Sequence, residues 1–344
     1  MNVSFPRFAE KLSSDVGGCC IWLGAGASIA LTRGATPSWP ALVTTVAAEH
    51  GKPEPDNADL PEGLEQLSQA IGHTTFRAEL RKHLVDPILS APIDLNVAAN
   101  QAVIGARAGS LVSFNVEAIS ATPFALLTHG QTIWRTFRER TDFAANIFPK
   151  PKSGAISKPI YFPHGLLPFS NVVMTKSEYA RHLGSLAVTT AVHLAIGADL
   201  VILGMSLADR YLREAILQNR RWLRDVYWLG ASFAFQEWAR VAHVTCVRVD
   251  HADLWPGLAK AILAADHDGG IAQLLDHRRP QLGQIFTDLI SWHSRIPTAL
   301  DALATQLLGS AHPLEHIIMF EQACVDAGYP VPPALAAHLA LAMG

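Results

Sequence analysis

Cys20-Ile-Trp-Leu-Gly24-Ala-Gly26-Ala-Ser28-Ile29 is the stretch that decides the fold. An apolar run typical of a buried strand breaks into a Gly-Ala-Gly-Ala-Ser turn and then into helix-forming residues. After a parallel strand, a turn without side chains lets backbone N–H groups approach a pyrophosphate, and the helix N-terminus adds positive partial charge. The stretch therefore predicts a dinucleotide-binding strand, turn and helix, although it lacks the third glycine of the usual fingerprint.

Polar residues also follow three later apolar runs. These segments are Leu111-Val-Ser113-Phe-Asn115-Val-Glu117, Pro159-Ile-Tyr-Phe-Pro163-His164-Gly165 and Asp199-Leu-Val-Ile-Leu-Gly204-Met-Ser206-Leu-Ala-Asp209. In an open α/β sheet, ligands bind in the crevice outside the carboxyl ends of the strands. We therefore expect the four strand ends to converge on one site.

Helical and apolar segments alternate along much of the chain. We expect helices over residues 38–108, 175–196, 208–221 and 233–242, and strands over 199–204, 225–229 and 243–249. No element is assigned to residues 134–152, which are rich in aromatic and basic residues, and from 268 the pattern is helical only, with Pro280 and Pro297 as punctuation. Such alternation is typical of βαβ units and a parallel sheet. The predicted fold class is α/β, a Rossmann-like parallel sheet with an inserted helical lobe and a C-terminal helical region.

In the order and spacing of these motifs, residues 15–260 resemble the sirtuin (silent-information-regulator) family, which binds NAD. The resemblance implies that His164 is the catalytic imidazole and that Asn115 assists it. It also implies that the helical insertion of residues 38–108 covers the cofactor. The cofactor-binding residues that it implies are Gly24, Ala25, Gly26, Ser28, Glu117, Gly165, Gly204, Ser206 and Asp209.

The chain departs from protein-deacylating sirtuins in three places. A structural zinc needs about four ligands at close spacings, and the four cysteines, Cys19, Cys20, Cys246 and Cys324, form no Cys-x-x-Cys pair, so no metal is expected. The text Gly34-Ala-Thr-Pro-Ser-Trp39 is similar to that of bacterial antiphage sirtuin-like proteins that hydrolyse NAD. Glu117 stands where the family usually has Asp.

Several of these residues have a structural alternative. His129 also precedes a glycine after an apolar run and could take the role of His164. Asn115 and Asp209 could cap the helices that follow them, and Glu117 could be a first-turn carboxylate. Two further expectations are Trp39 as core packing, and Asp250 with His251 as a border of the adenine.

The predicted activity is that of an NAD nucleosidase (NAD glycohydrolase), which hydrolyses NAD to nicotinamide and ADP-ribose. An imidazole that titrates near neutral pH suits a general base at the ribose. The resemblance implies an NAD-depleting effector of a bacterial antiphage or abortive-infection system. The alternatives are an NAD-dependent protein deacylase and a non-catalytic nucleotide-binding regulatory subunit.

Composition agrees with a cytoplasmic protein. The net charge of -3 does not indicate a nucleic-acid-binding surface. Charged residues interrupt the long apolar stretches, and we find no signal peptide. We expect a catalytic domain over residues 1–267 and an oligomerisation or docking region over 268–344.

The expected partners are NAD, further copies of the chain, and a sensor or ATPase protein. The docking expectation depends on an apolar stripe at helical spacing, whose alternative is packing on the sheet domain. A chain ending near Gly270 is expected to keep NAD binding. The stripe contains Phe286, Leu289, Ile290, Trp292, Ile296, Leu300, Leu303 and Leu307.

Overall fold

The structure is a computed structural model of the chain. It describes residues 3–14, 18–55, 59–117, 119–127, 133–136, 159–165, 167, 172–181, 184–309, 314–326 and 329–343. Within these residues, no helix combines the length and the apolar character needed to cross a membrane.

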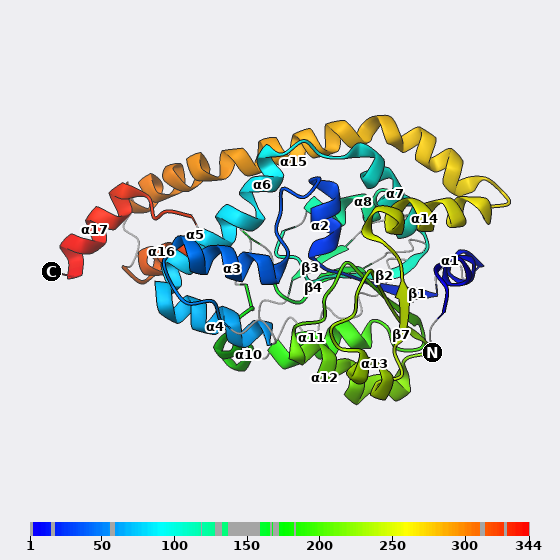
Figure 1. Cartoon of the computed structure of the whole chain (residues 1–344). Helices are drawn as coiled ribbons and strands as arrows, with labels where there is room; N and C mark the ends of the chain where they lie inside the picture. The colour runs from blue at the N-terminus through cyan, green and yellow to red at the C-terminus, as the bar shows by residue number, and fades with distance from the viewer. Residues whose placement is uncertain are drawn as a thin grey trace.

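The centre of the fold is a sheet in which every pairing is parallel (Figure 1). Within the described residues it has seven strands in the order β3-β4-β2-β1-β5-β6-β7. Their bounds are β1 Cys19–Leu23, β2 Ala108–Ser113, β3 Ile133–Thr136, β4 Pro159–Phe162, β5 Asp199–Leu203, β6 Val226–Gly230 and β7 Thr245–Arg248. The chain builds outward from β1 in both directions, so the strand order reverses beside β1, where ligands of such sheets bind. The predicted fold class is confirmed, although β3 lies in a segment to which the sequence assigned no element.

Helices cover both faces of the sheet, because successive side chains of a strand point to opposite faces. In β1, Ile21 and Leu23 pack with α1 (Phe5–Ser14), α7 (Leu95–Ala106) and α14 (His251–Ala264). Cys20 and Trp22 pack on the other face with α11 (Gly184–His193), α12 (Arg210–Asn219) and α13 (Gln236–Val241). All five residues of β1 are buried, as its unbroken apolar sequence predicts.

The helical insertion has two parts. Helices α3 (Trp39–Glu49), α4 (Leu60–Ile71), α5 (His73–Leu84) and α6 (Asp86–Ser90) lie beside the sheet in Figure 1. The buried apolar residues of α3, α4 and α5 form a cluster with Val116, Val172 and Met174, against which Leu89 of α6 packs. Helix α7 instead belongs to the layer on the sheet, because Ala98, Ala102 and Ile104 pack with strand residues. The lobe next to the strand ends is therefore α3 to α6.

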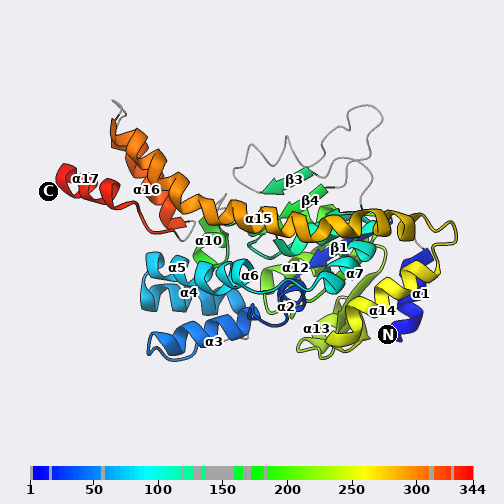
Figure 2. The same ribbon diagram turned by 90° about the horizontal axis from the view of Figure 1, so that it is seen from above.

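The C-terminal region consists of α15 (Gly270–Gly309), α16 (Leu314–Asp326) and α17 (Pro333–Met343) (Figure 2). Pro280 and Pro297 were expected to interrupt helices, but both lie inside α15. Leu282 and Phe286 of α15 belong to the sheet's own core, whereas Ala304 packs with α16 and α17.

The expected stripe is therefore divided along α15. Phe286 is buried in the sheet core, whereas Leu303 is 43% exposed, and the side chain of Trp292 lies outside the described ones. This burial supports the packing alternative for the first part of α15. The division of the chain at residue 268 stays a prediction.

Candidate functional site

Two glycine turns face each other at the carboxyl ends of β1 and β5. Gly24 is the residue before α2 (Ala25–Leu31), and the N–H groups of Gly24 and Gly26 donate to Leu203 O and Gly204 O at 3.0 and 2.9 Å. A Cβ on Gly26 would lie 2.6 Å from the Cα of Gly204, and Gly204 itself has a φ of +64°. The absence of side chains thus serves the contact between the turns, and these two N–H groups are already taken by backbone oxygens.

Asn115 joins the end of β2 to the first turn. Its Nδ2 lies 3.1 Å from Gly24 O, 3.1 Å from Ser28 Oγ and 3.0 Å from Ser120 Oγ. Because an amide nitrogen has two protons, the three acceptors share them. The buried amide therefore fixes the glycine turn against β2.

Glu117 lies beneath the same turn and is 2% exposed. Its Oε1 accepts hydrogen bonds from the hydroxyls of Ser28, at 2.9 Å, and Ser120, and its Oε2 accepts from Ser120 N at 2.8 Å. Burial raises the pKa of this carboxyl to about 7, although these hydrogen bonds favour the ionised form. The bond to Ser120 N ties Glu117 to the 3₁₀ turn Ile119–Ala121, whose own first turn contains no acidic residue, so the alternative of a first-turn carboxylate is not borne out.

His164 follows β4 and is held at both ring nitrogens. Nδ1 lies 3.1 Å from Phe114 O, and Nε2 lies 2.6 Å from the Tyr179 hydroxyl. That hydroxyl is 2.6 Å from Oδ2 of Asp209, whose other oxygen accepts from Tyr211 N and caps α12. Gly165, with a φ of +80°, turns the chain after the histidine. His164, Tyr179 and Asp209 are all buried and will be called the buried triad.

Tyr179 is carried by α10 (Lys176–Arg181), which begins with a capping box. Glu178 N donates to Thr175 Oγ1 at 3.3 Å, and Thr175 N donates to Glu178 Oε2 at 2.9 Å. Glu178 also forms a buried ion pair with Arg77 of the lobe, which places α10 against α5. The sequence analysis did not identify Tyr179 as the partner of His164.

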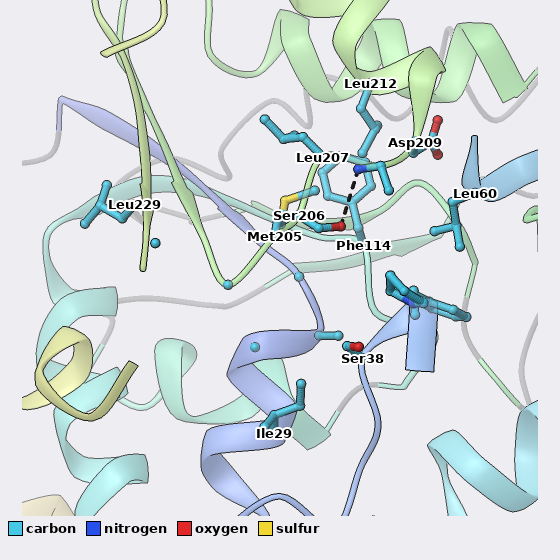
Figure 3. A pocket seen from close by; sticks show the side chains of 18 of the residues that line it. Ile29, Ser38, Leu60, Phe114, Met205, Ser206, Leu207, Asp209, Leu212 and Leu229 are labelled. Atoms are coloured by element: carbon cyan, nitrogen blue, oxygen red, sulfur yellow. Dashed lines mark hydrogen bonds between the residues drawn. The ribbon is translucent and has the colours of Figure 1, made fainter. Parts of the chain in front are cut away.

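A cavity of about 230 Å³ opens between the turns, the lobe and the triad (Figure 3). In Figure 3, Ile29 and Ser38 lie on one side of it and Met205 and Ser206 on the other. Trp39, expected as core packing, is half-buried, packs against the core of the lobe and also lines this cavity. The predicted site residues on its wall are Gly24, Ala25, Gly26, His164, Gly204, Ser206 and Asp209, together with His251.

The other predicted site residues, Ser28, Asn115, Glu117 and Gly165, are not among the residues that line this cavity. Ser28, Asn115 and Glu117 line a small hollow that shares Ala25 and Trp39 with it. A larger hollow of about 590 Å³ between α2, α7 and α14 shares Gly26, Ile29 and His251 with the cavity. Asp250 stands at the N-cap of α14, and His129, the alternative to His164, lies outside the described residues.

The comparisons with known proteins give similarity to solved structures but not to sequences. No protein-family model matches the sequence, and no curated protein matches it. A solved structure described as "Structural Basis for the Mechanism and Regulation of Sir2 Enzymes" matches 77% of this chain and 98% of its own, at 14% identity and a TM-score of 0.42. With such low identity and TM-score, the match identifies no family for this chain.

Proposed function

We propose that the chain hydrolyses NAD to nicotinamide and ADP-ribose. One observation carries the proposal: His164 and the two glycine turns, which come from three separate strand ends, line one cavity at the point where the strand order reverses. Ligands of doubly wound sheets bind at this point. The motif order in the sequence supports NAD as the ligand.

The wall of the cavity fits part of a dinucleotide. Gly24, Gly26 and Gly204 leave the turns bare of side chains, whereas both carboxylate oxygens of Asp209 already accept hydrogen bonds, from the Tyr179 hydroxyl and from Tyr211 N. At about 230 Å³ the cavity is smaller than the roughly 300–1,000 Å³ of most ligand sites. A whole dinucleotide would therefore extend into the larger hollow that shares Gly26 and His251 with it.

The chemistry needs one base at the ribose. Cleavage of the nicotinamide–ribose bond releases nicotinamide as a neutral molecule while the sugar approaches an oxocarbenium ion, as in glycoside hydrolysis. His164, whose side chain borders the cavity, would take a proton from the attacking water. Asn115 would act by holding the glycine turn in place, since its Nδ2 donates to Gly24 O and Ser28 Oγ.

The test is to incubate the purified full chain with NAD, with and without an acetylated peptide, and to measure nicotinamide and ADP-ribose by chromatography. We expect peptide-independent release of both products. His164→Ala should lower the rate by about 10²–10⁴, the usual loss of a general base, whereas His267→Ala, at an exposed position, should not. Activity should survive EDTA.

Each other outcome names a different function. Cleavage that requires the peptide identifies a deacylase. An NAD-dependent rise in melting temperature without cleavage identifies a nucleotide-binding module. If the chain neither binds nor cleaves NAD, NAD is refuted as the ligand.

The proposal includes a role as the NAD-depleting effector of a bacterial antiphage or abortive-infection system, supported by the Gly34-Ala-Thr-Pro-Ser-Trp39 text. Such an activity would need control by self-assembly or by a sensor or ATPase partner. Inducible expression in bacteria, with cellular NAD measured before and after phage infection, tests this role. NAD should fall with the wild-type chain and stay constant with His164→Ala.

A further inference from the structure

The hydrogen-bond contacts of the buried triad need one proton more than its three groups hold in their ordinary neutral-pH forms. Phe114 O can only accept a hydrogen bond, so His164 Nδ1 at 3.1 Å must carry a proton. The Tyr179 hydroxyl has one proton and two close partners, His164 Nε2 and Asp209 Oδ2, each at 2.6 Å. One hydroxyl proton cannot serve both contacts.

Two arrangements satisfy the contacts. If Tyr179 donates to an ionised Asp209, His164 Nε2 must also carry a proton, and the imidazole is positively charged. If Tyr179 donates to His164, Asp209 must be protonated in order to donate to Tyr179. Burial and the neighbouring Asp209 keep the pKa of the Tyr179 phenol well above its ordinary value, so the tyrosinate form does not contribute.

In both arrangements His164 has no nitrogen free for a substrate. His164 and Asp209 line the cavity, whereas Tyr179 is not among its lining residues and is 3% exposed. When the extra proton leaves, Tyr179 can keep its charge-assisted bond to Asp209, which is the stronger of the two. The lone pair on His164 Nε2 is then left without a donor and becomes available to the cavity.

Other charged and titratable groups surround the triad, and most of those described are paired. Glu178, next to Tyr179 on α10, is neutralised by Arg77 of α5. Asp59, before α4, pairs with Arg210 at 3.2 Å, and Arg213 donates to Leu207 O. The Tyr211 ring stacks on Tyr179 at 4.3 Å.

We propose that Tyr179 and Asp209 are positioning residues that hold His164 with a shared proton and set the pH above which it can act as a base. The proposal rests on the proposed NAD hydrolysis. Once the triad has lost the shared proton to solvent, Nε2 accepts a proton from the attacking water. The water oxygen then bonds to the anomeric carbon, and the electron pair of the breaking ribose–nitrogen bond leaves with nicotinamide.

The kinetic test compares kcat/KM for NAD between pH 5 and 9 in the wild type and two variants. Tyr179→Phe removes the hydroxyl that holds Nε2. In Asp209→Asn the amide can donate to Tyr179, which donates to neutral His164, and asparagine can still cap α12. Both variants should move the midpoint of the acid limb to lower pH by about one unit, a tenfold change in proton affinity.

The matched control is Tyr227→Phe, which removes a phenol bonded to Lys11 and Asp225 on the other side of the sheet. Its acid limb should keep the wild-type midpoint. If Tyr179→Phe and Asp209→Asn instead lower kcat/KM by one factor at every pH, or move the midpoint upward, their role is only structural and the proposal is wrong.

A measurement without NAD separates this proposal from the proposed function. In protein labelled with ¹³C and ¹⁵N at histidine, the His164 ring signal is identified by its loss in His164→Gln and followed against pH. The midpoint of its titration should fall in Tyr179→Phe and stay in Tyr227→Phe. If the chain cleaves no NAD but shows this difference, the proposal of a shared proton stands and the proposed NAD hydrolysis is wrong. Equal midpoints would overturn the shared proton whatever the activity.

Discussion

Replacing Glu117 by glutamine should change how the stability of the protein depends on pH. Glu117 is buried, and its pKa is raised from 4.5 to about 7 because burial disfavours the charged form. A group whose pKa is raised in the folded state contributes stability that is fully present below its unfolded-state pKa. That stability is lost as the pH rises from about 4.5 to about 7.

The size of the effect follows from the shift. A rise of about 2.5 pKa units corresponds to about 3 kcal/mol of unfolding free energy, and about 2–3 kcal/mol of it falls between pH 5 and pH 8. A glutamine side chain cannot ionise, so the unfolding free energy of the variant lacks this pH-dependent contribution. Its amide would face the donor Ser120 N, which lowers the stability of the variant by an amount that does not depend on pH.

The assay is urea unfolding at pH 5 and pH 8, followed by tryptophan fluorescence, for the wild type and Glu117→Gln. The unfolding free energy of the wild type minus that of the variant should fall by about 2–3 kcal/mol between the two pH values. Glu237→Gln is the control, because Glu237 is exposed and paired with Arg240 on the same helix. A difference between the wild type and Glu117→Gln that is the same at both pH values would refute the reasoning.

Two further predictions concern packing. Gly26→Ala places a Cβ against the Gly204 backbone and should lower the unfolding free energy by about 1–3 kcal/mol, as overpacking does. It should also weaken the NAD-dependent shift in melting temperature. Gly270→Ala, where the added Cβ meets open space, is the control, and equal melting curves of the Gly26→Ala variant and the wild type would contradict the expectation. A chain ending at residue 270 loses Leu282 and Phe286 from the sheet core and should have a far lower melting temperature, whereas a chain ending at residue 309 keeps both residues. Light scattering and thermal melting compare the two shortened chains with the full chain. An unchanged melting temperature of the shorter chain would show that α15 is dispensable for stability.

The central strands could be predicted because their sequences contain the signal themselves. Strands buried on both faces are continuous apolar runs, and β1 and β5 have this form. Strand β3 could not be found in this way, because Ile-Trp-Arg-Thr contains a charge and, within the described residues, lies at an edge of the sheet next to β4. Helix α15 was divided in the prediction because proline usually ends a helix, yet Pro280 and Pro297 both lie inside it.

The candidate site was predictable as a set of strand ends but not as a set of contacts. The topology of a parallel sheet brings Gly24, Asn115, His164 and Gly204 to one edge whatever their side chains do. It does not determine that Glu117 turns beneath the glycine turn toward Ser28, while His164 turns toward Tyr179. Those choices depend on hydrogen-bond partners, and a buried polar group must find them wherever the fold provides them. Tyr179 is supplied by a helix whose position depends on the pairing of Glu178 with Arg77, 101 residues away in the sequence. A motif can therefore identify the histidine, but only the packing of the lobe against α10 shows which hydroxyl contacts its Nε2.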